Sequence, residues 1–433
     1  MNHGLRIFSK YVSANVLGMI GISCYILADT FFIARGLGSN GLAALNLAIV
    51  MYSLIYAAGQ MIGIGGGTQY AVAGARQDQI AMDMAFMQSI YMVTLVGILF
   101  VTAGLFFSGP ISFFLGADEA TFVMTNTYLR MIFLFSPVFM MNQVMIAFVR
   151  NDGNPALSMA AMLLGSGANI VLDYIFIFIN NWGMFGAVLA TCLAPAISLS
   201  LLSIHVIRRK NRFHLRRCLL RPKQMGNIAG LGMAAFINEI SSGMLLFLFN
   251  LTILGLEGNI GVAAYGVVAN LALVAVAMFT GVAQGVQPII SEAYGKSDRI
   301  QIRQMYRYAI LVSVWIAVLL YVAVYAFHAS IVEAFNSEHN ARLQEMAMDG
   351  LKLYFVGFLF AGPNIITASC FGAMEKVRKS FVLSVLRGIV VIVPVLLLLA
   401  RICGMTGVWL AFPCTELLVL FISICFVKDK KVR

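Results

Sequence analysis

Long apolar runs recur along the whole chain, and they constrain its fold more than any other feature. Each run holds about 20 or more mainly apolar residues, the length that an α-helix needs to cross a lipid bilayer. None alternates between apolar and polar residues as membrane β-strands do, so the runs predict helices. Only 11% of the residues are charged, too few to cover a soluble protein. We therefore predict an all-α polytopic membrane protein with twelve transmembrane helices, at 12–34, 42–66, 84–107, 122–146, 157–179, 184–206, 228–251, 262–287, 306–328, 350–371, 381–400 and 405–427.

The basic residues predict the orientation of these helices. If the helices alternate across the membrane, 23 of the 29 lysines and arginines fall on the side of the N-terminus and four on the other. Eight of them lie in the connection 207–227. Because cytoplasmic loops are enriched in lysine and arginine, both termini are expected in the cytoplasm. The net charge of +11 is then a topological signal and gives no reason to expect nucleic-acid binding.

The second half of the sequence resembles the first. Residues 67–70 resemble 285–288, and 183–187 resemble 404–408, so both pairs are separated by nearly the same offset, close to half of the chain. Six crossings per half put both halves in the same orientation, related by an axis along the membrane normal. We expect two pseudo-symmetric six-helix bundles around a central cavity, which favours a transporter. The predicted domains are an N-terminal lobe (1–207), a basic inter-lobe linker (208–227) and a C-terminal lobe (228–433).

Four acidic residues lie deep in the apolar runs, at Asp29, Asp173, Glu239 and Glu416. Ionisable residues in membrane spans are costly and usually face a cavity or a partner. Asn169 precedes Asp173 by four residues, so the two side chains share one helix face. Glu416 has no polar partner nearby in sequence, which favours a structural helix contact there.

The first two acids have further polar neighbours in the sequence. Tyr25 precedes Asp29 by one helical turn, and Thr191 adds a hydroxyl in the sixth run. An all-oxygen pocket of this kind suits a hard cation such as Na⁺. Two close carboxylates could instead share a proton. A hydrogen-bonded helix contact without an ion is the third interpretation.

Signals for other chemistry are scarce. The sequence has no Walker A, H-E-x-x-H or G-x-S-x-G motif, and the seven cysteines show no metal or disulfide spacing. We expect no enzymatic activity and no cofactor. An ion gradient is the natural energy source for transport, with H⁺ or Na⁺ as the coupling ion.

Several segments resemble the multidrug and toxic compound extrusion (MATE) family, most of all its bacterial MepA-like branch. The resemblance covers nearly the whole chain. It is carried by the Gly-rich end of the second run and by 28–38, 169–173, 284–291 and 408–413. It implies drug/cation antiport by two six-helix lobes.

The resemblance also implies roles for particular residues. The family's cation site in the N-terminal lobe falls on Asp29, Asn169, Asp173 and Thr191. Some members carry a functional acid at the position of Glu239. In the tenth run, where some members have an aspartate, this chain has Asn364, which weakens a C-terminal ion route. The substrate cavity is expected to include Tyr25, Gln60, Met61, Asn142, Met145 and Gln284.

The leading hypothesis is a secondary-active exporter of amphipathic, often cationic drugs, working as a monomer in the bacterial inner membrane. A lipid-linked oligosaccharide flippase of the related superfamily is the alternative. It is disfavoured because only Arg130 and Arg387 are intramembrane bases that could bind phosphate. A channel or a non-transporting receptor is disfavoured by the repeat and by the buried acids.

Overall fold

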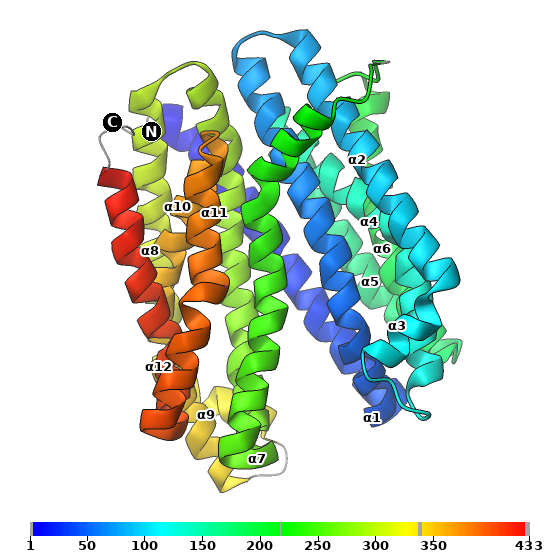
Figure 1. Cartoon of the computed structure of the whole chain (residues 1–433), viewed down its shortest axis with the longest axis vertical. Helices are drawn as coiled ribbons and strands as arrows, with labels where there is room; N and C mark the ends of the chain where they lie inside the picture. Colours follow the sequence, from blue (N-terminus) through cyan, green and yellow to red (C-terminus); the bar gives the residue numbers. More distant parts are fainter. Residues whose placement is uncertain (1–2, 217, 337–339, 429–433) are drawn as a thin grey trace.

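The structure, a computed structural model, describes residues 3–216, 218–336 and 340–428. This part of the chain contains helices and their connections, and no β-strand (Figure 1). One short helix, α3, lies in a connection where the sequence predicted no element. The helices are α1 (His3–Ala75), α2 (Gln79–Phe106), α3 (Ser108–Phe114), α4 (Phe122–Asn151), α5 (Pro155–Tyr174), α6 (Gly183–Ile207), α7 (Pro222–Gly295), α8 (Arg299–Phe335), α9 (Ala341–Tyr354), α10 (Phe358–Ala373), α11 (Val377–Val385) and α12 (Ile392–Lys428), with π-helical turns at Ile175–Ile179 and Leu386–Val390 and a 3₁₀ turn at Phe355–Gly357.

The all-helical membrane fold predicted from the sequence is confirmed. Within the described residues, nine helical segments are long and apolar enough to span a membrane. Three of them have 72, 74 and 52 residues, and each bends sharply at one glycine, so each can cross twice. The predicted breaks between the first and second, seventh and eighth, and eleventh and twelfth spans are therefore bends within continuous helices. The bends lie at Gly38, Gly258 and Gly404, whose φ angles of 68°, 64° and 58° combine with ψ angles of −162°, −154° and −135°, a backbone conformation that favours glycine.

The internal repeat is visible in the backbone. We call residues 3–207 the N-half and residues 222–428 the C-half. Gln77 and Ser297, which occupy matching positions in the two halves, both have φ of 58°. Asp78 and Asp298 follow them, and each caps the next helix by accepting a hydrogen bond of 2.9 Å from the backbone N–H three residues on. The same turn thus recurs at the offset at which the sequence repeats.

Each half has its own hydrophobic core, and the two halves exchange helix ends. Most buried apolar side chains of the N-half form one cluster, and most of those of the C-half form another. Phe8 and Val12, at the start of α1, pack into the C-half cluster. Ile228, at the start of α7, packs into the N-half cluster. The predicted division into lobes at 208–227 stays a prediction.

Glycines allow the two halves to approach closely. A Cβ atom on Gly65 would lie 1.9 Å from the carbonyl oxygen of Ile228, and one on Gly232 would lie 1.9 Å from that of Met61. No other residue fits at these crossings. The contacts join the last part of α1 to the first part of α7, whose end and start lie at the end of the molecule where α1 begins and α12 ends, which we call the terminal face (Figure 1). The bends at the three glycines lie at the opposite face.

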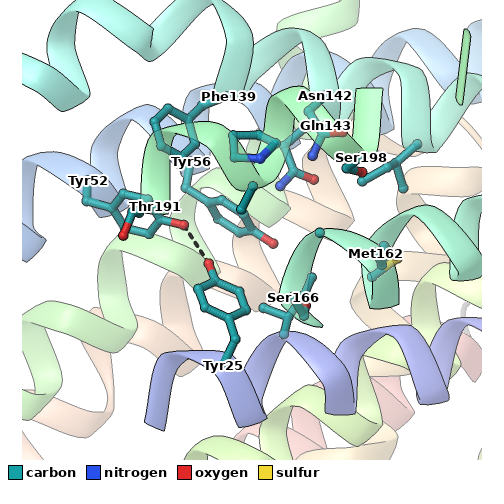
Figure 2. A pocket seen from close by; sticks show the side chains of 15 residues that line it. Tyr25, Tyr52, Tyr56, Phe139, Asn142, Gln143, Met162, Ser166, Thr191 and Ser198 are labelled. Carbon is teal, nitrogen blue, oxygen red and sulfur yellow. Dashed lines mark hydrogen bonds between the residues drawn. The ribbon is translucent and has the colours of Figure 1, made fainter. Parts of the chain in front are cut away.

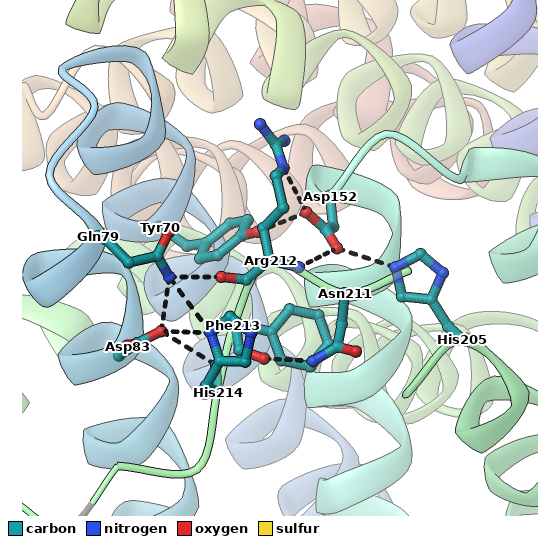
Figure 3. A network of polar contacts seen from close by, with 9 residues as sticks. All are labelled: Tyr70, Gln79, Asp83, Asp152, His205, Asn211, Arg212, Phe213 and His214. Carbon is teal, nitrogen blue, oxygen red and sulfur yellow. Dashed lines mark hydrogen bonds and ion pairs between the residues drawn. The ribbon is translucent and has the colours of Figure 1, made fainter. Parts of the chain in front are cut away.

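Two buried carboxylates, Asp83 and Asp152, fasten the connection after α6 to the N-half (Figure 3). Asp152 accepts hydrogen bonds from the Tyr70 hydroxyl and from the backbone N–H and Nε of Arg212, the latter two at 3.0 and 2.9 Å. His205 Nε2 lies 2.9 Å from the same carboxylate. Partial burial lowers the pKa of the Arg212 guanidinium, but its bond to Asp152 and the nearby negative charges raise that pKa by more. Phe213, which is 1% exposed, follows as an apolar anchor.

Candidate ion and substrate site

Three helices of the N-half bring together the four residues predicted to form an ion site. Asp29 comes from α1, Asn169 and Asp173 from α5, and Thr191 from α6. Their side chains are 7%, 0%, 0% and 4% exposed, respectively. The predicted common face of Asn169 and Asp173 therefore points into the protein. Asp173 ends the regular part of α5, and the π-helical turn Ile175–Ile179 follows it at once.

These buried polar groups are not satisfied by one another. Oδ1 of Asp29, both carboxylate oxygens of Asp173 and both amide atoms of Asn169 have no hydrogen-bond partner among the described residues. The carboxyl groups of Asp29 and Asp173 also interact electrostatically with each other. Buried polar groups are nearly always paired, so this cluster lacks a partner that a cation or a proton would supply.

The ligand set favours a monovalent ion. No group of three or more His, Cys, Asp or Glu side chains able to hold a metal occurs in the described part of the chain. Two carboxylates with neutral oxygens from Asn169 and Thr191 fit Na⁺, and two carboxylates alone fit a shared proton. The geometry is compatible with both coupling ions.

Tyr128 on α4 is a neighbour of this site that the sequence analysis missed. Its side chain is 3% exposed, its hydroxyl interacts with Thr191, and it lies in the electrostatic field of Asp29 and Asp173. Within an apolar run, a tyrosine has no spacing signal that distinguishes it from a packing residue.

A small aromatic pocket adjoins the ion site (Figure 2). Its volume is about 50 Å³, and Thr191 belongs to both. The Tyr25 and Tyr52 hydroxyls are hydrogen-bonded at 2.8 Å, and Tyr25 also lies in the field of Asp29 and Asp173. Asn142 also lines this pocket, and its Oδ1 has no hydrogen-bond partner among the described residues. The remaining lining includes Tyr56, Phe139, Gln143, Met162, Ser166 and Ser198.

Four residues predicted to line the substrate cavity lie elsewhere. Gln60 and Gln284 are hydrogen-bonded to each other across the two halves at 3.1 Å. Met61 is at the glycine crossing with Gly232, and Met145 is buried in the N-half core. None of the four lines the pocket beside the ion site, and their contact with substrate stays a prediction.

The terminal face is closed by a polar network around a buried arginine. Arg150, at the end of α4, is 1% exposed and donates to Asn15 Oδ1 at 2.8 Å and to Gln284 Oε1 at 2.9 Å. Gln287 adds a bond of 3.0 Å to Thr68 Oγ1. Arg150 is one of the 23 basic residues predicted on the side of the N-terminus, and nothing near it in sequence indicates its partners on α1 and α7.

The acid of the twelfth predicted span is fully paired. Arg387 Nε donates to Glu416 Oε1, and Asn364 Nδ2 donates to Glu416 Oε2 at 2.9 Å. Ser423 in turn donates to Asn364 Oδ1 at 2.9 Å. The sequence analysis found no polar neighbour for Glu416, because Arg387 and Asn364 belong to other predicted spans.

Glu239 on α7 faces the N-half across the molecule. It is partly exposed, and its charge acts on Tyr25 and Tyr56. The C-half thus contributes one acid to the space beside the aromatic pocket.

Two relatives of the chain are proteins named multidrug export protein MepA. That of Staphylococcus haemolyticus is 28% identical over 427 residues, covering 96% of this chain and 92% of its own. The protein of Staphylococcus saprophyticus is 26% identical over 395 residues, covering 91% of this chain and 86% of its own length.

Solved structures with the same fold include an outward-facing multidrug resistance MATE family transporter of the MOP superfamily. Its TM-score is 0.91 at 22% identity, covering 98% of this chain and 97% of the other. A MOP superfamily transporter from Pyrococcus furiosus gives 0.90 at 21% identity, with the same coverage. The MatE family model matches residues 15–175 and 234–397, one stretch in each half. With most of its length matched, the chain belongs to the MatE family, that of the multidrug and toxic compound extrusion proteins.

Proposed function

We propose that this protein is a secondary-active multidrug efflux transporter that exchanges amphipathic, often cationic drugs for H⁺ or Na⁺. The observation that carries the proposal is the buried, unpaired pair Asp29 and Asp173 beside an aromatic pocket. The names of the MepA relatives support the drug class.

The ion and the substrate are coupled through their shared residues. A cation or proton entering from the opposite face compensates one of the two negative charges of Asp29 and Asp173, and Thr191 and Tyr25 pass this change to the aromatic pocket. A cationic drug near the same carboxylates is then disfavoured, because its attraction to them is weakened. Exchange follows when the two ligands compete for one set of charges.

We propose that the transporter is a monomer in the bacterial inner membrane, with the terminal face in the cytoplasm. The distribution of lysine and arginine supports this orientation. The contacts between the halves, through Arg150, Gln284 and the glycine crossings, support a state in which the terminal face is closed. Opening that face and closing the other would complete alternating access.

The decisive experiment is efflux of ethidium from proteoliposomes with pH and Na⁺ gradients imposed separately. Wild-type protein should respond to one gradient, and Asp173→Asn should lose that response. Asp349→Asn, which removes an exposed carboxylate on α9, is the matched control and should retain it. Transport by Asp173→Asn at the wild-type rate, with normal insertion, would disprove the site.

The flippase alternative has little support from the side chains. Of the two bases in the spans, Arg130 is exposed on α4, and Arg387 is bonded to Glu416. Neither is placed to receive a phosphate in a central cavity. If the same proteoliposomes move lipid-linked oligosaccharide across the membrane but do not move drugs, the flippase would be preferred over the drug exporter.

A further inference from the structure

A groove at the terminal face of the N-half is filled by the chain itself. Phe213, from the connection after α6, is buried among the rings of Tyr70, Phe86 and Phe148, with centroid distances of 6.0, 4.5 and 5.8 Å. Further along, the Tyr91 hydroxyl donates to the Cys218 carbonyl oxygen at 2.9 Å. This groove therefore lies between the end of α1, the first turns of α2 and the ends of α4 and α6.

The repeat places an equivalent groove in the C-half. When the two halves are aligned on their matching turns, the three rings around Phe213 correspond to Ile290, Tyr306 and Cys370. All three line a cavity of about 1330 Å³ between the ends of α7, α10 and α12 and the start of α8. The C-half thus has an open cavity where the N-half is filled.

The charges of the two grooves are opposite. In the N-half, Asp83 accepts from the His214 backbone N–H at 3.0 Å, and Asp152 binds Arg212. The counterpart of Asp83 in the repeat is Arg303. Among the described residues that line the C-half cavity there is no carboxylate, and the lining includes Arg303, Arg307 and Lys428. This groove suits an anionic ligand.

An apolar stripe leads from this groove along α8. Ile300 and Leu311 line the cavity and are 82% and 56% exposed. Trp315 and Leu319 continue the same helix face at four-residue spacing, and they are 66% and 62% exposed. On a membrane-spanning helix this stripe faces lipid chains, while the cations lie at the level of the headgroups.

We propose that the C-half cavity binds an anionic phospholipid from the leaflet at the terminal face. Arg303 and Arg307, one turn apart on α8, bind the headgroup phosphate, and the acyl chains lie along the stripe. Basic pockets between membrane helices at the cytoplasmic side are suited to such headgroups. An acidic peptide would leave the apolar stripe uncovered. The sequence 429–433 has three basic residues and one acid, so it does not complement the cavity.

The test is native mass spectrometry of the full-length protein in detergent, titrated with phosphatidylglycerol or phosphatidylcholine. Wild-type protein should prefer phosphatidylglycerol by about tenfold, and Arg303→Gln/Arg307→Gln should bind it about 10- to 30-fold more weakly. The matched control Arg76→Gln/Lys223→Gln removes two exposed charges from the same face and should bind as wild type. Arg303→Lys/Arg307→Lys keeps the charge and should retain binding, which guards against a folding defect.

Several results would overturn the lipid site. If wild type and Arg303→Gln/Arg307→Gln bind phosphatidylglycerol equally well, the two arginines do not belong to the lipid site. If wild-type protein binds phosphatidylcholine as tightly as phosphatidylglycerol, the site does not recognise the anionic headgroup. Displacement of the lipid by glycerol phosphate at equal concentration would show a simple anion site. Tighter lipid binding after deletion of 429–433 would show that the chain itself occupies the cavity.

Discussion

The polar interiors of the two halves share two equivalent helices, the fifth and sixth spans of each half, but their charged side chains are paired differently. In the N-half, Asp29 and Asp173 leave carboxylate oxygens without a hydrogen-bond partner among the described residues. In the C-half, Glu416 is bonded to Arg387 and Asn364. A charge that is paired inside the protein cannot respond to an ion, whereas an unpaired one must recruit a cation or a proton. One half of the repeat is therefore suited to coupling and the other to rigidity.

The scaffold around these groups differs much less than the side chains do. The fifth helix of each half ends its regular part in a π-helical turn, Ile175–Ile179 after Asp173 and Leu386–Val390 around Arg387. Such turns widen a helix and are frequent at functional sites. Both halves thus keep a local distortion, and the identity of a few side chains decides whether unpaired carboxylates or an ion pair lie beside it.

The largest effect is expected from Asp29→Asn. Efflux driven by the ion gradient should fall to the level of protein-free vesicles, because one carboxylate cannot hold and release the coupling ion as two do. The free energy of unfolding of Asp29→Asn should equal or exceed that of wild type, since a buried unpaired charge is removed. Proteoliposome efflux and thermal unfolding measure the two quantities. Gradient-driven efflux by Asp29→Asn at the wild-type rate would show that the unpaired carboxylates of the N-half do not couple transport to the ion gradient.

Glu416→Gln should act on the fold instead. It leaves Arg387 buried without its counter-charge, which costs about 3–5 kcal/mol of stability in comparable ion pairs. The fraction of folded protein should fall, while the ion dependence of the protein that remains folded should not change. Glu416→Gln/Arg387→Met should recover most of the stability. If Glu416→Gln is as stable as wild type but loses its response to the gradient, Glu416 takes part in coupling, and coupling is not confined to the N-half.

The sequence was sufficient for the helices and for the shared helix face of Asn169 and Asp173, and insufficient for contacts between distant segments. Asn169 and Asp173 share a face because of a four-residue spacing that any helix imposes. The pairing of Glu416 with Arg387 depends on how three helices pack, which no local pattern encodes. The glycine bends were missed for a related reason, because a glycine between two apolar runs is compatible with both a loop and a bend.

Phe213→Ala tests the filled groove of the N-half. Removing a buried phenylalanine ring costs about 3 kcal/mol or more, since the surrounding rings of Phe86 and Phe148 lose their contacts. Tyr306→Ala, at the counterpart of Phe86 beside the open C-half cavity, should cost clearly less because that side chain is partly exposed. Thermal unfolding of the two variants measures the difference. Equal losses would show that the two grooves are packed alike.

The smallest effect is expected from Arg150→Met, which separates the halves at the terminal face. Arg150 belongs to the N-half, and its counterpart in the repeat is Gly372, so the C-half supplies no matching cation. Losing two charged hydrogen bonds costs about 1.5–3 kcal/mol, which shifts the equilibrium away from the closed terminal face by about tenfold or more. Spin labels at Asn181 and Arg401, both exposed at the opposite face, should then report shorter distances, in a background without native cysteines. An unchanged distance distribution would mean that the glycine crossings alone hold this face closed.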